Sequence, residues 1–139
     1  FKNMQLTAAW EFEFQIVNYT CLSHSQYMAS HVHPEVDFSA IHYIQFDKEH
    51  HTPTKFKSTL PYTPYISTLR PDLFKILSPK HLSNSWALGT WEIGTEEDDF
   101  CFFPAFLKHG INPQTSKNKN RITVVLNISL RKSQSSIKR

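Results

Sequence analysis

The feature that most constrains the fold is a set of short segments with the period of a β-strand, in a chain without a long helical period. Residues 9–16 alternate apolar and polar side chains, which predicts a half-buried strand. Residues 38–46 are more apolar and predict a central strand, and residues 121–128 form the strongest strand segment because they are β-branched and nearly continuous. Further strands are expected at 54–57, 86–93 and 99–103. Such strands without strand–helix alternation favour an antiparallel sandwich or barrel.

The length of 139 residues predicts a single domain, residues 1–139. Four prolines fall between residues 61 and 80, so we expect a long covering loop there, with one short helix around residues 72–77. Residues 130–139 are basic and rich in serine, which predicts a tail beyond the folded core.

The apolar runs and the cysteine count indicate the compartment in which the protein works. No run approaches the roughly 20 apolar residues of a membrane span, and the first residues, FKNMQL, lack the apolar region of a signal peptide. Cys21 and Cys101 are too few for a disulfide scaffold, so we expect an intracellular, cytoplasmic protein.

The net charge of +3 is unevenly distributed: residues 1–99 hold seven Lys/Arg and twelve Asp/Glu, whereas residues 100–139 hold eight Lys/Arg and no acid.

Three of the eight histidines form a pattern typical of a metal site. His31 and His33 are two residues apart, so both project from the same face of an extended segment. His109 follows a hydrophobic stretch that would carry one polar side chain into a dry cavity. A jelly-roll metal site has this layout, with ligands far apart in the sequence. The alternative is that the His31 and His33 pair lies on the surface by chance.

Arg121 opens the strongest strand segment, and Thr123 lies on the same face two residues later. A buried arginine needs an anionic partner because an unpaired interior cation is costly. Its planar guanidinium suits bidentate binding of a carboxylate. A strand-end arginine facing solvent is the alternative, and the nearby His109 favours the buried interpretation.

Two segments resemble the core of the Fe(II)/2-oxoglutarate-dependent oxygenases. The first is HVHPEVDFSAIHYI, residues 31–44, and the second begins with Phe-Pro at residue 103 and runs through His109 to Thr123. The chain is most similar to the small oxygenases of bacteria and their phages, which are related to the prolyl hydroxylases. The resemblance covers residues 10–129. It implies a double-stranded β-helix (jelly roll) that is all-β, mainly antiparallel, with minor helical segments, in the cytoplasm of a bacterium or of a phage-infected host.

The resemblance also implies roles for individual residues. His31, His33 and His109 would be the ligands of Fe(II), and Arg121 would pair with the distal carboxylate of 2-oxoglutarate. Thr123 and Tyr43 would add hydroxyl hydrogen bonds to the same carboxylate. Such an enzyme hydroxylates its substrate and releases succinate and CO2. Peptidyl and small-molecule substrates both fit the sequence.

The sequence leaves open which residue is the third metal ligand. The superfamily usually has Asp or Glu where this chain has His33, and the set of two histidines and one carboxylate marks these oxygenases. Glu35, in a His33–Glu35 pair, or Asp37 from the loop could supply the carboxylate. We favour the three histidines, a neutral set that Zn or Ni could also occupy.

Other function classes fit parts of the sequence. A cupin-type metal enzyme would use similar histidines, but it has no need of Arg121 and usually has turn glycines that are missing here. A non-catalytic jelly-roll binding or structural module would explain the aromatic residues without a metal. The basic C-terminal segment could touch phosphates, but it lacks interleaved aromatic residues, so we expect no nucleic-acid partner. The sequence leaves a homodimer open.

Overall fold

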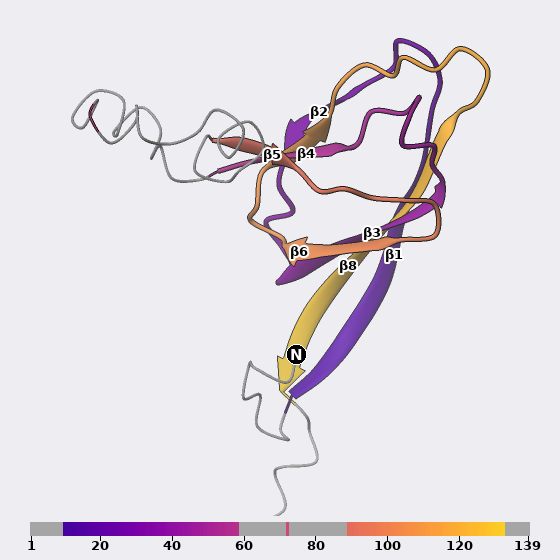
Figure 1. Ribbon diagram of the computed structural model, residues 1–139. Coiled ribbons are helices and arrows are strands. Elements are labelled where there is room, and N and C mark those ends of the chain that lie inside the picture. Colours follow the sequence, from indigo (N-terminus) through magenta and orange to yellow (C-terminus); the bar gives the residue numbers. More distant parts are fainter. Residues whose placement is uncertain (1–9, 59–71, 73–88, 133–139) are drawn as a thin grey trace, which may run out of the picture.

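The computed structural model describes residues 10–58, 72 and 89–132, and these form two four-stranded antiparallel sheets (Figure 1). The large sheet has the order β1 (Trp10–Leu22), β8 (Arg121–Lys132), β3 (Phe38–Gln45) and β6 (Phe100–Pro104). The small sheet has the order β2 (Met28–His31), β7 (His109–Ile111), β4 (Thr54–Lys57) and β5 (Thr90–Glu92). No helix within these ranges is long and apolar enough to cross a membrane.

The strands pair in a nested order. β1 pairs with β8, β2 with β7, β3 with β6 and β4 with β5, so the chain folds back on itself like one long hairpin. Two facing sheets built in this way form a jelly roll. The all-β, antiparallel prediction is therefore confirmed. Nesting also explains why residues far apart in the sequence become neighbours.

The core lies between the two sheets. Its apolar members come from both sheets and from the loops beside them, with Trp91 and Leu107 packed against them: Ile41, Tyr43, Phe46, Phe56, Cys101, Phe103 and Val125. Burial raises the pKa of the Cys101 thiol to about 11, so this cysteine acts as an apolar core residue.

Strand β1 differs from its prediction. It extends to Leu22, and Phe14 and Ile16 are 64% and 72% exposed, so the expected half-burial is wrong. The physical reason is geometric: the N-terminal part of β1 pairs with the end of β8 in a ribbon that projects beyond the other strands (Figure 1). β8 continues through Lys132, into the segment predicted as a tail. The loop and short helix predicted between residues 61 and 80 lie outside the described residues, except for Asp72.

Candidate metal and anion site

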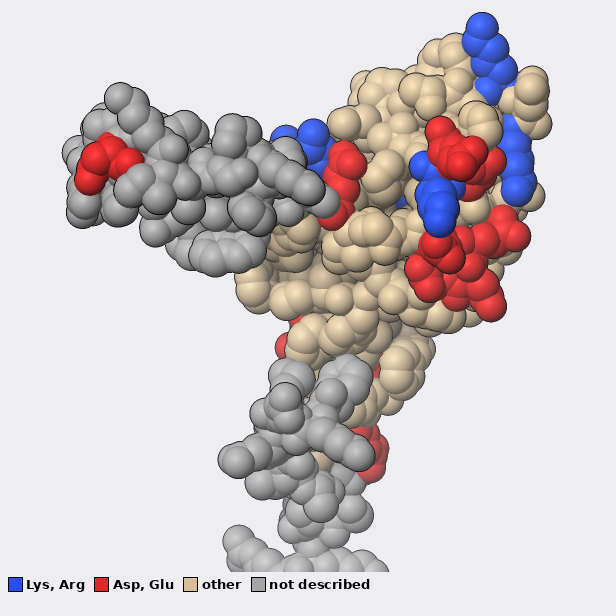
Figure 2. Space-filling view, viewed as in Figure 1, with Lys and Arg blue, Asp and Glu red and all other residues tan. Residues whose placement is uncertain are grey.

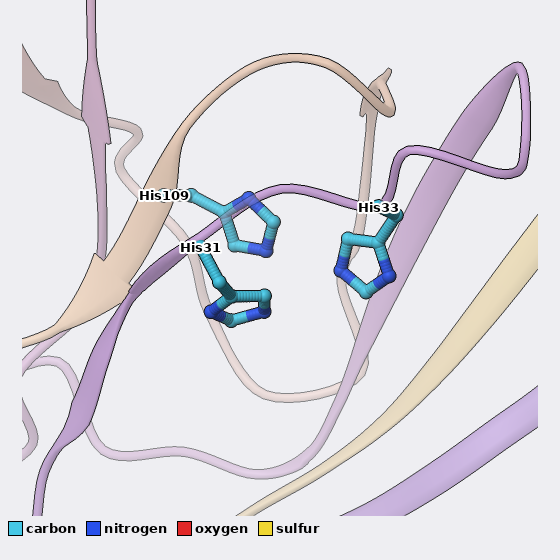
Figure 3. A group of neighbouring side chains, drawn as sticks. All are labelled: His31, His33 and His109. Carbon is cyan, nitrogen blue, oxygen red and sulfur yellow. The ribbon is translucent and has the colours of Figure 1, made fainter.

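Three histidine side chains meet at one end of the space between the sheets (Figure 3). His31 is the last residue of β2 and His109 is the first residue of β7, and the two are direct partners in the strand register. His33 follows two residues after His31. One nitrogen from each side chain lies within 4.8 Å of the other two. Within the described ranges, the predicted cluster His31, His33 and His109 is therefore brought together.

Hydrogen bonds orient two of these rings. Nδ1 of His31 lies 2.9 Å from the carbonyl oxygen of Ala29, and Nδ1 of His109 lies 2.9 Å from that of Leu107. A carbonyl oxygen only accepts, so each Nδ1 carries the hydrogen and each Nε2 keeps a free lone pair. Such partners hold metal-binding histidines in one tautomer and orientation.

The remaining donors also suit a metal ion. Nε2 of His33 is buried and has no hydrogen-bond partner among the described residues. Burial lowers the pKa of His109 to about 4, and burial followed by the nearby His31 lowers the pKa of His33. Both rings are therefore neutral near pH 7. Neutral imidazoles with converging lone pairs fit a divalent first-row metal such as iron, nickel or zinc.

Gly110 allows the two ligand-bearing strands to approach closely. A Cβ atom at this position would lie 2.9 Å from the carbonyl oxygen of Met28 and 3.0 Å from Oγ of Ser30. Real Cβ atoms do not come so close to backbone atoms, so any larger residue must push β7 away from β2. His109 and His31 depend on that contact for their position.

The two candidate carboxylates lie apart from the histidine cluster. The described residues that could share one ion are the three histidines, and neither Glu35 nor Asp37 joins them. Oδ2 of Asp37 accepts a hydrogen bond of 2.7 Å from the backbone N–H of Leu130. Asp37 therefore ties the loop after β2 to strand β8.

Arg121 is fully buried without a carboxylate partner in the described part of the chain. Its Nη2 donates to Oγ1 of Thr54 at 3.0 Å and its Nη1 to Oγ1 of Thr123 at 3.4 Å, while Nε has no partner there. The guanidinium carbon lies 5.1 Å from the centre of the Tyr43 ring. Burial lowers the pKa of Arg121, yet an arginine stays charged in proteins. Among the described residues, the partners of this buried cation are therefore hydroxyl groups and an aromatic ring, and none carries a negative charge.

One cavity joins the histidines to this cation. His31, His33, His109, Arg121 and Thr123 all line it, so five of the six predicted site residues face the same space. The sixth, Tyr43, is not among the lining residues and donates its hydroxyl hydrogen to Thr54 at 2.8 Å. The other lining residues are Asn18, Thr20, Met28, Ile41, Thr54, Ile111 and Val125.

Thr54 is a site residue that the sequence reasoning missed. It lies in a polar segment with few local signals, although the short strand predicted at 54–57 is confirmed as β4. In a strand, Thr54 and Phe56 share a face, and Phe56 is an apolar core residue. That alternation is the signal that could have placed Thr54 inside.

Within the described residues, acidic and basic parts of the sequence meet in three dimensions. Because the strands nest, the basic C-terminal part of the chain lies among the acidic N-terminal part. Lys119, for example, lies 3.6 Å from Glu97. Figure 2 shows acidic and basic side chains close together on one side of the body. The concentrated positive charge of the site is therefore Arg121 itself.

Fold and site together define a jelly-roll protein with a candidate metal centre facing a buried cation. The family described as "Putative 2OG-Fe(II) oxygenase" matches residues 18–127, and the chain belongs to this family. The matched range contains all three histidines, Arg121 and Thr54. No curated protein shows a significant match to the chain.

Proposed function

We propose that the protein is an Fe(II)- and 2-oxoglutarate-dependent dioxygenase that hydroxylates a substrate still to be identified. The observation that carries this proposal is the buried guanidinium of Arg121, without a carboxylate partner among the described residues, in the same cavity as three clustered histidines. A dicarboxylate would fit both parts of this cavity: one carboxylate would bind the metal at the histidines, and the other would neutralise Arg121. Membership of the oxygenase family supports the same chemistry.

In this proposal His31, His33 and His109 hold the iron, while Arg121 and Thr123 lie against the distal carboxylate of 2-oxoglutarate. Tyr43, the third residue predicted to bind this carboxylate, supports it from behind the cavity wall through its hydrogen bond to Thr54. When bound, iron and 2-oxoglutarate supply the oxidative step, in which one oxygen atom of O2 enters succinate, the other enters a C–H bond of the substrate, and CO2 is released. The protein acts in a bacterial or phage-infected cytoplasm, on a peptidyl or small-molecule substrate.

The chain's own residues orient the metal and exclude water. The carbonyl groups of Ala29 and Leu107 hold two imidazoles in the ligand tautomer. Phe103 packs edge-on against His109 with ring centres 4.7 Å apart, and Phe56 lies 6.0 Å from the same ring. This apolar surface lowers the local dielectric constant, which strengthens the attraction between Arg121 and a bound carboxylate.

A cupin-type metal enzyme is the second candidate, because the histidine cluster holds no carboxylate among the described residues. A neutral ligand set also suits zinc or nickel. Arg121 distinguishes the two functions: a cupin that binds no dicarboxylate leaves this cation unpaired.

The test is anaerobic titration of the metal-free protein with Fe(II), with and without 2-oxoglutarate, followed by absorption spectroscopy. We expect a metal-to-ligand charge-transfer band when both are present. His109→Gln should lose the metal, whereas Arg121→Ala should keep the metal and require far more 2-oxoglutarate. Arg131→Ala is the matched control, because this exposed arginine of the same strand pairs with Glu13 on the surface.

The proposal fails if iron-loaded protein shows no band at millimolar 2-oxoglutarate. It also fails if Arg121→Ala and Arg131→Ala bind 2-oxoglutarate equally well.

A further inference from the structure

The position of Thr54 relative to the histidines follows from the strand register. Phe56 of β4 pairs with His109 of β7, and Thr54 pairs with Ile111. Along the strand direction, Thr54 is therefore offset from His109 by two residues, which is about 6.8 Å in an antiparallel sheet. Its side chain is 1% exposed and lines the same cavity as the histidines.

The hydrogen bonds of Thr54 leave one proton unused. A threonine hydroxyl has two acceptor lone pairs and one donor hydrogen. The hydroxyl group of Tyr43 donates to Oγ1 of Thr54 at 2.8 Å, and Nη2 of Arg121 donates to the same atom at 3.0 Å. Both lone pairs are then occupied, and the hydroxyl hydrogen of Thr54 makes no hydrogen bond to any of the residues described. An unused donor in a buried cavity calls for an acceptor from a ligand.

Tyr43 is in the opposite situation. Its phenolic hydroxyl has one hydrogen, which it gives to Thr54. A carboxylate only accepts hydrogen bonds, so Tyr43 in this arrangement has no donor left for a ligand, and it does not line the cavity. Thr54 stands between Tyr43 and the space where a carboxylate would lie.

We propose that Thr54 donates its hydroxyl hydrogen to the distal carboxylate of the co-substrate and sets the chain length of the 2-oxo acid that the site accepts. The inference rests on the proposed function. Tyr43 is then a positioning residue, which acts by holding Thr54 with its hydrogen directed into the cavity. Thr54 and His109 line the same cavity two residues apart along the strands, so a shorter side chain at position 54 would lengthen the space open to a 2-oxo acid.

The test measures equilibrium binding by calorimetry on Mn(II)-loaded protein without turnover. The probes are 2-oxoglutarate and 2-oxopentanoate, which has a methyl group in place of the distal carboxylate. Thr54→Val removes the hydroxyl at nearly constant volume and should weaken 2-oxoglutarate binding about 10- to 100-fold, as expected for a lost hydrogen bond to a charged group. Binding of 2-oxopentanoate should change by less than about threefold, because this ligand never accepts that hydrogen.

Two further variants separate donation from packing. Thr54→Ser keeps the hydroxyl and should keep most of the 2-oxoglutarate affinity. Tyr43→Phe leaves the Thr54 hydrogen in place and should cost less than Thr54→Val. In Thr54→Ala, the added space should favour 2-oxoadipate, one methylene longer, and raise its affinity relative to 2-oxoglutarate.

Some results would overturn the inference. Equal weakening of both probes by Thr54→Val would make Thr54 a packing residue, and a larger loss in Tyr43→Phe than in Thr54→Val would make Tyr43 the direct donor. An unchanged preference for 2-oxoglutarate over 2-oxoadipate in Thr54→Ala would remove the role in chain length. If the wild-type protein binds neither probe when it holds the metal, the proposed function itself fails.

Discussion

Replacing Arg121 by methionine should stabilise the metal-free protein while abolishing 2-oxoglutarate binding. The guanidinium is fully buried, and burying an ion costs several kcal/mol. The contacts of Arg121 within the protein offset only part of this burial cost. The hydrogen bond to Thr54 at 3.0 Å contributes about 1.5–3 kcal/mol, and the Tyr43 ring contributes about 2 kcal/mol. The contact with Thr123 at 3.4 Å is near the limit of hydrogen bonding, and Nε has no partner in the described chain.

Methionine keeps an apolar stem in the same space and removes the buried charge. After a small cost for the lost volume, we expect the free energy of unfolding to rise by about 1–2 kcal/mol. For a domain of this size, that corresponds to roughly 1 M in the urea midpoint. The assay is urea unfolding of metal-free protein at pH 7, followed by far-UV circular dichroism.

Binding of 2-oxoglutarate should make the wild-type protein more stable than Arg121→Met. With metal bound and 2-oxoglutarate at 100 times its dissociation constant, the wild-type protein gains about 2.7 kcal/mol, and Arg121→Met gains nothing from the dicarboxylate. The reasoning is refuted if Arg121→Met lowers the free energy of unfolding of the metal-free protein by more than about 1 kcal/mol. That result would mean that Arg121 already has an anionic partner within the protein.

Three other predictions follow from the site. Glu35→Gln and Asp37→Asn should each bind Fe(II) within about threefold of wild type, whereas His33→Ala should lose at least about 100-fold; equal losses in the metal titration would contradict a three-histidine site. Gly110→Ala should lower the free energy of unfolding by about 2 kcal/mol and weaken Fe(II) binding, because its Cβ meets the backbone of Met28; unchanged values for both would show that β7 can move freely. The metal-free protein should lose about 3 kcal/mol of stability as pH falls from 6.5 to 4. The sign follows from His109, whose pKa is lowered to about 4, so the unfolded state binds the proton more readily than the folded state. In His109→Gln, the urea midpoint should depend less on pH, and an equal slope in both proteins would contradict this source.

The sequence anticipates this site unevenly, for physical reasons. His31 and His33 share a face in any extended segment, so their convergence follows from local geometry. Arg121 is identifiable because a charged residue opens an otherwise apolar strand. Thr54 is not, because its role depends on the register of β4 with β7, which is a non-local property. The exposure of β1 was predicted wrongly for a similar reason: alternation predicts a strand, but only the extent of its neighbours decides whether either face is covered.

Nested pairing has a consequence for how the protein is made. In the large sheet, the last strand, β8, lies between β1 and β3 and pairs with both. During synthesis, β1 and β3 therefore lack their shared partner strand until β8 leaves the ribosome, about a hundred residues after β1. Such long-range pairing folds slowly, and the waiting strands expose unpaired edges that other chains could join. Arg121 is the first residue of β8, so the anion-binding end of the cavity is completed only when the sheet itself closes.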